Sequence, residues 1–235
     1  MLALDTCDSR GSVAALRDNA MLHVAAHDSN EDYSSWLLPA VGRVLQGSGL
    51  EMANVDGYAV AAGPGSFTGV RVGLTTVKAW AEVYGKRIAA VSRLQALAMQ
   101  GVRESSHVAA FVDAHRGQVF GAIFQRKGEG LERLGEEMVI PPEKFIETAV
   151  ELSEGGTISW VSIDAAVLAS EENWKAREAL GEQVENVSGV LAPAIGRIGA
   201  RELAAGRFTD ALSLDANYVR RSDAEIFWKG VVHGG

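Results

Sequence analysis

Two stretches in different halves of the sequence repeat one pattern of apolar and turn residues. They are LALDTCDSRGSVAAL, from Leu2 to Leu16, and AAFVDAHRGQVFGAIF, from Ala109 to Phe124. Each reads as an apolar strand, an aspartate, a turn, an Arg-Gly pair and a second apolar strand, with Asp5 and Asp113 in equivalent places. An internal repeat constrains the fold more than any single motif, because each copy is one supersecondary unit. The repeat predicts two related lobes, each opening with a strand–Asp–turn–strand hairpin.

Strand and helix patterns alternate along the rest of the chain, which predicts an α/β fold with mixed sheets. The polar segment after Val102 divides the repeats, so we expect an N-terminal lobe over 1–103 and a C-terminal lobe over 104–235. Besides the two hairpins, the expected strands are Met21–His27, Asp56–Ala62, Arg87–Val91, one ending at Ile140, and Ile158–Ile163. The expected helices are Glu31–Gln46, one ending near Tyr84, Leu94–Val102, one starting at Pro141–Pro142, and Ala192–Ala205.

Charge and cysteine content limit the functions open to the chain. It has 235 residues, a formal net charge of -8 and a single cysteine, Cys7. An acidic chain without a basic cluster repels nucleic acid, so any link to nucleic acid is expected to run through a partner. A lone cysteine suits a reducing compartment, and neither a secretory leader nor an apolar run of membrane-spanning length is visible. We therefore expect a cytoplasmic location and no membrane contact.

A glycine-rich turn, AVAAGPGSFTGVRVGLTT from Ala59 to Thr76, joins an expected strand to an expected helix. Pro64 presets the first turn angle, and Gly65 is expected to take the positive φ of a type II turn. Ser66 or Thr68 is expected to cap the helix, whose free amides suit an anion. However, the P-loop lysine is missing, and a dinucleotide fingerprint would need glycine at Thr68. Phosphate binding and a plain strand-to-helix turn both remain open.

The helix after this turn carries Gly69 and Gly73 four residues apart, on one face. Each costs about 1 kcal/mol relative to alanine inside a helix, so another backbone is expected to approach closely there. Either the chain's own sheet or a partner protein supplies that backbone. The helix Glu31–Gln46 has an apolar face broad enough to leave part of it for a partner. The predicted partner interface comprises Tyr33, Trp36, Leu37, Ala40, Val41, Val44, Gly69, Val72, Gly73, Thr76, Val77 and Trp80.

The segment AAGPGSFTGVRVGL closely resembles the signature of the TsaB family. The hairpins starting at Leu2 and at Val112, and the closing segment YVRRSDAE from Tyr218 to Glu225, are similar to that family too, so the resemblance spans nearly the whole chain. It implies the two-lobed fold of the actin, Hsp70 and sugar-kinase group, with ribonuclease-H-like duplicated mixed sheets.

The resemblance also implies a function. TsaB proteins are non-catalytic partners in bacterial tRNA threonylcarbamoyladenosine synthesis. They pair through first-lobe helices with the catalytic sibling TsaD, which modifies the adenosine next to the anticodon, and the ATPase TsaE joins them. The resemblance thus implies contact with tRNA only through the complex. A homodimer is expected when the chain is alone, since the same small-residue helix face can self-associate.

At two places the sequence differs from that of the catalytic sibling, and both differences imply that the chain has no catalytic activity of its own. The sibling's metal-binding His-x-x-x-His pair falls here on Ser92-Arg93-Leu94-Gln95-Ala96-Leu97, which holds no histidine. The strand expected to lead into an adenine-binding glycine turn ends instead in WVSIDAA, from Trp160 to Ala166. The resemblance therefore implies no catalytic residue, no metal and no cofactor, apart from weak ATP or ADP binding at a partner interface.

A vestigial phosphate or nucleotide cleft is the remaining expectation from the sequence. Arg71 is expected to pair with an acid in that cleft or across the interface. The alternative function is a degenerate ATP-dependent phosphotransferase or a metallopeptidase-like enzyme of the same superfold, with Asp5 and Asp113 holding Mg²⁺ between the lobes. The expected cleft residues are Asp5, Thr6, Gly63, Gly65, Ser66, Thr68, Arg71 and Asp113.

Overall fold

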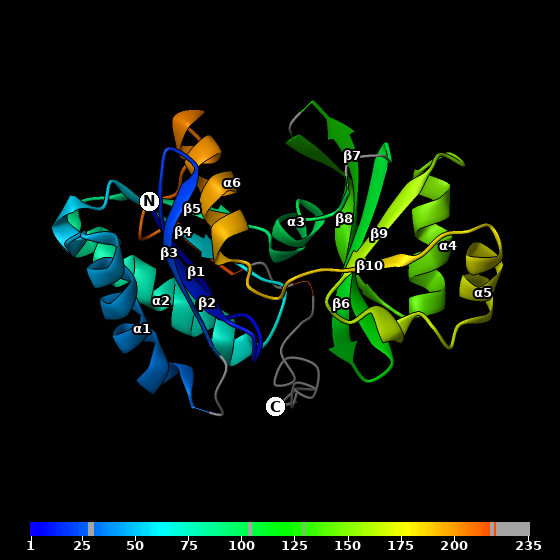
Figure 1. Ribbon diagram of the computed structural model, residues 1–235, viewed down its shortest axis with the longest axis horizontal. Coiled ribbons are helices and arrows are strands. Elements are labelled where there is room, and N and C mark those ends of the chain that lie inside the picture. The colour runs from blue at the N-terminus through cyan, green and yellow to red at the C-terminus, as the bar shows by residue number, and fades with distance from the viewer. Residues whose placement is uncertain (28–30, 103–104, 129, 217–218, 220–235) are drawn as a thin grey trace, which may run out of the picture.

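The computed structural model describes residues 1–27, 31–102, 105–128, 130–216 and 219. It has two lobes side by side, each built around a five-stranded sheet (Figure 1). The family-like closing segment from Tyr218 to Glu225 lies outside the described residues, apart from Val219. No helix in the described part of the chain combines the length and apolarity that a bilayer span requires.

The strands and helices follow the expected alternation along the chain. The strands are β1 (Leu2–Asp5), β2 (Ser12–Arg17), β3 (Ala20–Ala26), β4 (Gly57–Ala61), β5 (Arg87–Val91), β6 (His107–His115), β7 (Gln118–Lys127), β8 (Gly130–Ile140), β9 (Ile158–Ser162) and β10 (Val184–Asn186). The helices are α1 (Tyr33–Ser48), α2 (Phe67–Tyr84), α3 (Arg93–Ala98), α4 (Pro142–Leu152), α5 (Glu172–Ala179) and α6 (Ala192–Ala204), with short 3₁₀ turns η1 (Met52–Asn54) and η2 (Ala165–Val167).

The two sheets have the same topology. The first has the order β3-β2-β1-β4-β5, and the second, read from its opposite edge, has the equivalent order β8-β7-β6-β9-β10. In both, the first three strands are antiparallel and the last two join in parallel. The hairpins β1–β2 and β6–β7 occupy equivalent positions at the centre of each sheet. The predicted duplicated, two-lobed α/β fold is therefore confirmed.

The last helix of each half packs on the other half. Helix α3 follows β5 but lies against β6, β7 and β9, while α6 follows β10 and crosses back onto β1, β2, β4 and β5 (Figure 1). Gly196 and Gly199 permit this return, because a Cβ at either position would collide with Leu16 or Ala59 of the first sheet. A division at residue 103 separates the two sheets, but it assigns both α3 and α6 to the lobe whose sheet they do not pack on.

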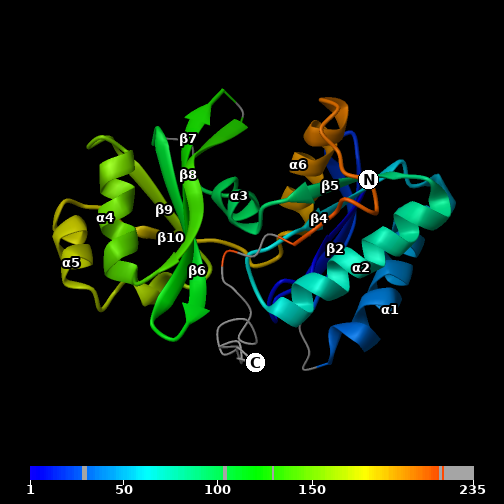
Figure 2. The same cartoon turned by 180° about the vertical axis from the view of Figure 1, so that it is seen from behind.

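Helices α1 and α2 cover the face of the first sheet opposite α6 (Figure 2). The close approach predicted at Gly69 and Gly73 occurs within the chain. A Cβ at Gly69 would overlap the carbonyl oxygen of Thr6, and one at Gly73 would lie 2.6 Å from Thr6 Oγ1. The glycines thus fit α2 against the end of β1, so the partner interpretation of these two residues is wrong.

Most of the predicted interface side chains are also buried in the chain's own core. This burial corrects the prediction, because a side chain packed under its own helix offers no surface to a partner. Both helices have apolar stripes that face the sheet. The buried members are Trp36, Leu37, Ala40, Val41, Val44 and Val77. Tyr33, Val72, Thr76 and Trp80 are half-buried.

A matched pair of glycine substitutions tests this packing. We expect Gly69→Ala to lower the free energy of unfolding by about 1–3 kcal/mol, because the added methyl group meets the Thr6 backbone. Gly42 lies exposed on α1, and a Cβ added there would meet only open space. Gly42→Ala should therefore raise stability by about 1 kcal/mol through helix propensity alone. Urea unfolding measures both values, and a Gly69→Ala variant as stable as Gly42→Ala would contradict the packing.

Some local predictions differ from the structure. Helix α3 ends at Ala98 rather than near Val102, and α5 and β10 were not expected. The signal for α5 is weak because Trp174 is its only buried side chain. A helix held by one apolar contact lacks the repeating stripe on which a periodicity argument depends.

Candidate functional site

The candidate site lies where β1 ends, at the loop Thr6–Gly11 between β1 and β2. Asp5 is fully buried there, and its Oδ1 accepts a hydrogen bond from the backbone N–H of Cys7 at 2.9 Å. Its Oδ2 has no hydrogen-bond partner. Burial raises the pKa of Asp5, and the charge of Arg93 opposes that rise. The first predicted cleft residue is thus an interior carboxylate.

Arg93, the first residue of α3, places a buried guanidinium beside that carboxylate. Its side chain is 2% exposed, and Nε lies 3.5 Å from Asp5 Oδ2. Its Nη2 donates to Asp8 Oδ2. Burial disfavours the charged form of Arg93, but Asp5 and Asp8 outweigh it and raise its pKa. Burial likewise opposes ionisation of Asp8, yet Arg93 and Arg10 lower its pKa. The three groups form one charged cluster inside the molecule.

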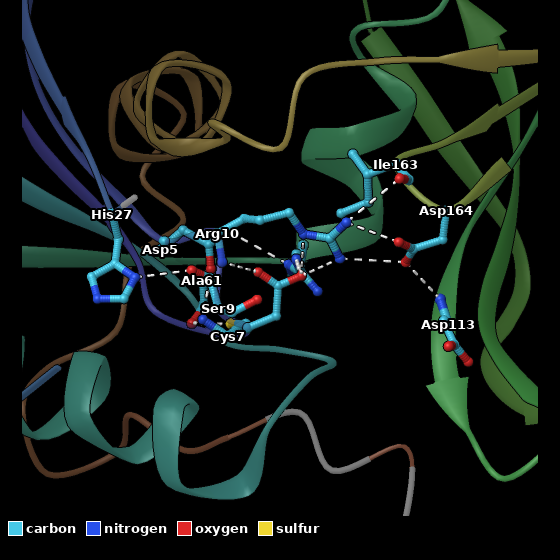
Figure 3. Close-up of polar contacts among 12 residues, drawn as sticks. Asp5, Cys7, Ser9, Arg10, His27, Ala61, Asp113, Ile163 and Asp164 are labelled. Carbon is cyan, nitrogen blue, oxygen red and sulfur yellow. Dashed lines mark hydrogen bonds and ion pairs between the residues drawn. The ribbon is translucent and has the colours of Figure 1, made fainter. Parts of the chain in front are cut away.

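Arg10 carries this cluster across to the second lobe (Figure 3). Its Nη2 lies 2.7 Å from Asp8 Oδ2, and its Nη1 lies 2.8 Å from Asp164 Oδ1, in the turn after β9. Asp164 Oδ2 in turn accepts from the backbone N–H of Asp113 at 2.9 Å. The arginines and aspartates therefore alternate from the first sheet to the second.

Two aromatic residues hold the same loop from the side of α1. The hydroxyl of Tyr33 donates to the carbonyl oxygen of Asp8 and accepts from the N–H of Gly11, the latter at 2.7 Å. The ring of His27 lies between two carbonyl groups, with Nδ1 2.9 Å from the oxygen of Ser9. Burial raises the pKa of the Tyr33 hydroxyl, so it stays protonated and keeps donating.

The glycine turn packs on this loop and does not form an open phosphate-binding site. The positive φ falls on Gly63, at 114°, and not on Gly65 as predicted. Gly65 is needed for another reason, since a Cβ there would overlap the backbone of Cys7. The N–H of Ser66 donates to the carbonyl oxygen of Cys7 at 2.6 Å. Of the two predicted caps, Ser66 takes the role, with its side chain accepting from Gly69 N–H.

Of the other predicted cleft residues, Thr6 lies at the loop, whereas Thr68, Arg71 and Asp113 lie apart from it. Thr6 Oγ1 donates to the carbonyl oxygen of Gly69 at 2.7 Å, which ties β1 to α2. Thr68 and Arg71 are exposed on α2, and the Arg71 guanidinium lies 3.7 Å over the ring of Phe67. Asp113 Oδ1 accepts from the N–H of His115 at 2.7 Å. The structure therefore brings Asp5, Thr6 and the glycine turn together and places Arg71 on the exposed side of α2.

Asp5 and Asp113 do not form the open carboxylate pair that a Mg²⁺ site would need. Arg10 and Asp164 lie between them (Figure 3), and Arg93 already neutralises Asp5. Within the described ranges, no three His, Cys, Asp or Glu side chains gather as a metal site would require. The residues present fit internal ion pairing better than a divalent cation.

Sequence reasoning missed four members of the cluster: Asp8, Arg10, Arg93 and Asp164. One signal was available, because Arg10 belongs to the Arg-Gly pair that the internal repeat singles out. Arg93 stands in the segment 92–97, which was singled out in the sequence only because it holds no histidine. Asp164 offered no signal, since its role depends on how the second lobe lies against the first.

Comparison with known proteins finds relatives named for tRNA threonylcarbamoyladenosine biosynthesis. The family model described as "TsaD: tRNA N6-adenosine threonylcarbamoyltransferase" matches residues 24–209. The "tRNA threonylcarbamoyladenosine biosynthesis protein TsaB" of Escherichia coli is 31% identical over 78% of this chain and 75% of its own length. The Bacillus subtilis protein of that name is 33% identical over 57% of this chain, and the match spans 58% of that relative's length.

A solved structure agrees with these sequence relatives. "YeaZ from Pseudomonas aeruginosa" is 27% identical, with a TM-score of 0.73 over 92% of this chain and 98% of that one. Its similarity extends across both lobes, beyond the segments that the sequence relatives share. The chain belongs to the TsaB family, within the wider group that the transferase model describes.

Proposed function

We propose that the chain is a non-catalytic subunit that supports a TsaD-type threonylcarbamoyltransferase in forming tRNA threonylcarbamoyladenosine. The names of its relatives support the pathway. The observation that carries the non-catalytic role is the buried cluster: Asp5 and Asp8 are both paired with Arg93 of the same chain. A carboxylate engaged in this way is a poor general base or metal ligand, because each such role would require breaking a buried ion pair.

The exposed side of α1 and α2 is the docking surface that we propose for the transferase. Leu38 is 60% exposed on α1, while Phe67 and Val83 are 40% and 74% exposed on α2. Exposed apolar side chains on two neighbouring helices suit a protein interface. Half-buried Tyr33, Val72, Thr76 and Trp80 lie on the same two helices, so four of the interface residues predicted from sequence remain in the proposal.

Other parts of the assembly follow from the same proposal. A TsaE-type ATPase joins the pair, and weak ATP or ADP binding belongs to the partner interface rather than to the internal cluster. The chain alone forms a homodimer through the same surface, because a twofold pair would cover the exposed apolar side chains of both copies. The net charge of -8 disfavours direct tRNA contact, so the tRNA is held by the partner subunits.

Reconstitution of tRNA threonylcarbamoylation tests the proposal. The assay combines the TsaD-type transferase, the ATPase, tRNA and a source of the threonylcarbamoyl adenylate, with and without this chain. We expect product formation to require the chain, and the chain alone to release no product from the same substrates. A rate that is unchanged when the chain is left out would contradict the proposed function.

A further inference from the structure

We propose that the loop Thr6–Gly11 couples partner docking on α1 and α2 to the spacing of the two lobes, with the Arg10–Asp164 ion pair as its latch. The inference rests on the proposed docking function and adds regulation to it. The loop is short, and the structure fixes it from both sides. Docking helices hold one side, and the second lobe holds the other.

Contacts on the docking side come from both helices. Tyr33, at the start of α1, bonds to the Asp8 carbonyl and to the Gly11 amide, and so spans the loop. On α2, the Gly69 carbonyl accepts from Thr6 Oγ1 at 2.7 Å, and the Ser66 amide donates to Cys7. Gly69 and Gly73 leave no spare room against Thr6. A shift of α1 or α2 therefore moves the loop.

Two guanidinium groups make the contacts on the other side: Arg93, on the α3 helix that packs on the second sheet, donates to Asp8, and Arg10 reaches Asp164. Arg10 Nη1 and Nη2 lie 2.8 and 3.4 Å from the two carboxylate oxygens of Asp164. Asp164 is itself fixed, because its amide donates to Ser162 Oγ on β9 and its carboxylate accepts from the Asp113 amide on β6. A two-point contact of this kind fixes direction as well as distance. Arg10 therefore transmits the position of the loop to the neighbouring strands β6 and β9 of the second lobe.

One of the two segments that cross between the lobes passes beside the same side chain. A Cβ at Gly189, between β10 and α6, would lie 3.1 Å from Cδ of Arg10. The aliphatic part of Arg10 thus packs on this connection between the lobes. Since Tyr33 holds the loop in the latched arrangement, a partner seated on α1 and α2 favours that arrangement. If docking strengthens the Arg10–Asp164 ion pair by some factor, thermodynamic linkage requires that loss of this ion pair lower the affinity for the partner by the same factor.

Distance and affinity measurements on one set of variants test the coupling. Spin labels on cysteines at Ala204 and Glu151, exposed on α6 and α4, report the lobe spacing, while Cys7 is buried. We expect Arg10→Ala to broaden and lengthen this distance in the free chain, and Arg10→Lys to restore part of it. Binding of the TsaD-type partner should narrow the distribution in the unmodified chain. Lys127→Ala, which breaks an exposed ion pair within the second lobe, should change nothing.

Affinity completes the test. Coupling energies between sites usually correspond to factors of about 5–150, so Arg10→Ala should weaken partner binding by about fivefold or more. In a Tyr33→Phe background, the same change should weaken binding by a smaller factor, because the loop then contacts the docking helices only through α2. Equal affinity and equal lobe spacing with and without Arg10 would overturn the coupling alone. An unmodified chain that does not bind the partner would overturn the proposed function as well.

Discussion

Replacement of Arg93 with leucine is expected to lower the free energy of unfolding by about 3–5 kcal/mol. The guanidinium is 2% exposed and lies between Asp5 and Asp8, so its removal leaves a buried carboxylate without a counter-ion. Leucine is smaller than arginine, so part of the loss is packing, and the double variant Asp5→Asn, Arg93→Leu separates that part from the loss of charge. Urea unfolding at neutral pH measures the change. A loss below about 1 kcal/mol would show that the buried pairing does not hold this part of the fold.

The pH dependence of this variant gives an independent check. Burial raises the pKa of Asp5 above its ordinary value of 3.8, and Arg93 opposes that rise. Without Arg93, the folded chain binds a proton at Asp5 more tightly than the unfolded chain does. The variant therefore recovers stability relative to the unmodified protein as the pH falls through the folded-state pKa. The double variant Asp5→Asn, Arg93→Leu should regain most of the loss at all pH values. A deficit that grows with acidity would contradict the assignment.

Gly42→Trp is expected to abolish partner docking while the chain stays folded. Gly42 is one turn from exposed Leu38 on α1, and no atom lies close to where its Cβ would be. A tryptophan there projects into the proposed interface and does not enter the core. We expect the dissociation constant for the TsaD-type partner to rise by at least about 100-fold, or about 2.8 kcal/mol. Calorimetric titration measures it, and circular dichroism confirms the fold.

Ala204→Trp is the matched control for this substitution. Ala204 is exposed on α6, which covers the opposite face of the same sheet. The control adds the same side chain to the same lobe and should leave partner affinity within about twofold. If both variants bind as the unmodified chain does, the interface lies elsewhere. Gly73→Trp is unsuitable for this purpose, because its side chain would strike Thr6 in the core.

More of the fold than of the candidate site could be predicted from the sequence. The repeated hairpin predicts two lobes, because strand alternation and turn residues are local properties. The return of α6 to the first sheet was not predictable in this way. Its apolar stripe predicts a helix that packs on a sheet, but it does not say on which of two equivalent sheets. The structural role of Gly196 and Gly199 can be recognised only in the structure, where Leu16 and Ala59 lie directly beneath them.

The candidate site was even harder to predict from the sequence, because its residues come from distant parts of the chain. Asp5 was identifiable because an aspartate that ends a buried strand is chemically conspicuous. Its partner Arg93 is far away in the sequence, and nothing in its neighbours indicates a buried guanidinium. The glycine pair was correctly identified as a close approach, but the approaching backbone is Thr6 rather than another protein. Spacing predicts that contact will occur, whereas the tertiary structure decides which group makes it.

The most direct test of the central claim compares two variants in the reconstituted tRNA modification assay. Asp113→Ala removes the half-exposed carboxylate that a catalytic pair would need, and Gly42→Trp alters only the proposed docking surface. A docking subunit predicts a rate within about twofold of the unmodified chain for Asp113→Ala and almost no product with Gly42→Trp. Loss of product with Asp113→Ala and full activity with Gly42→Trp would contradict the account and point to chemistry between the lobes.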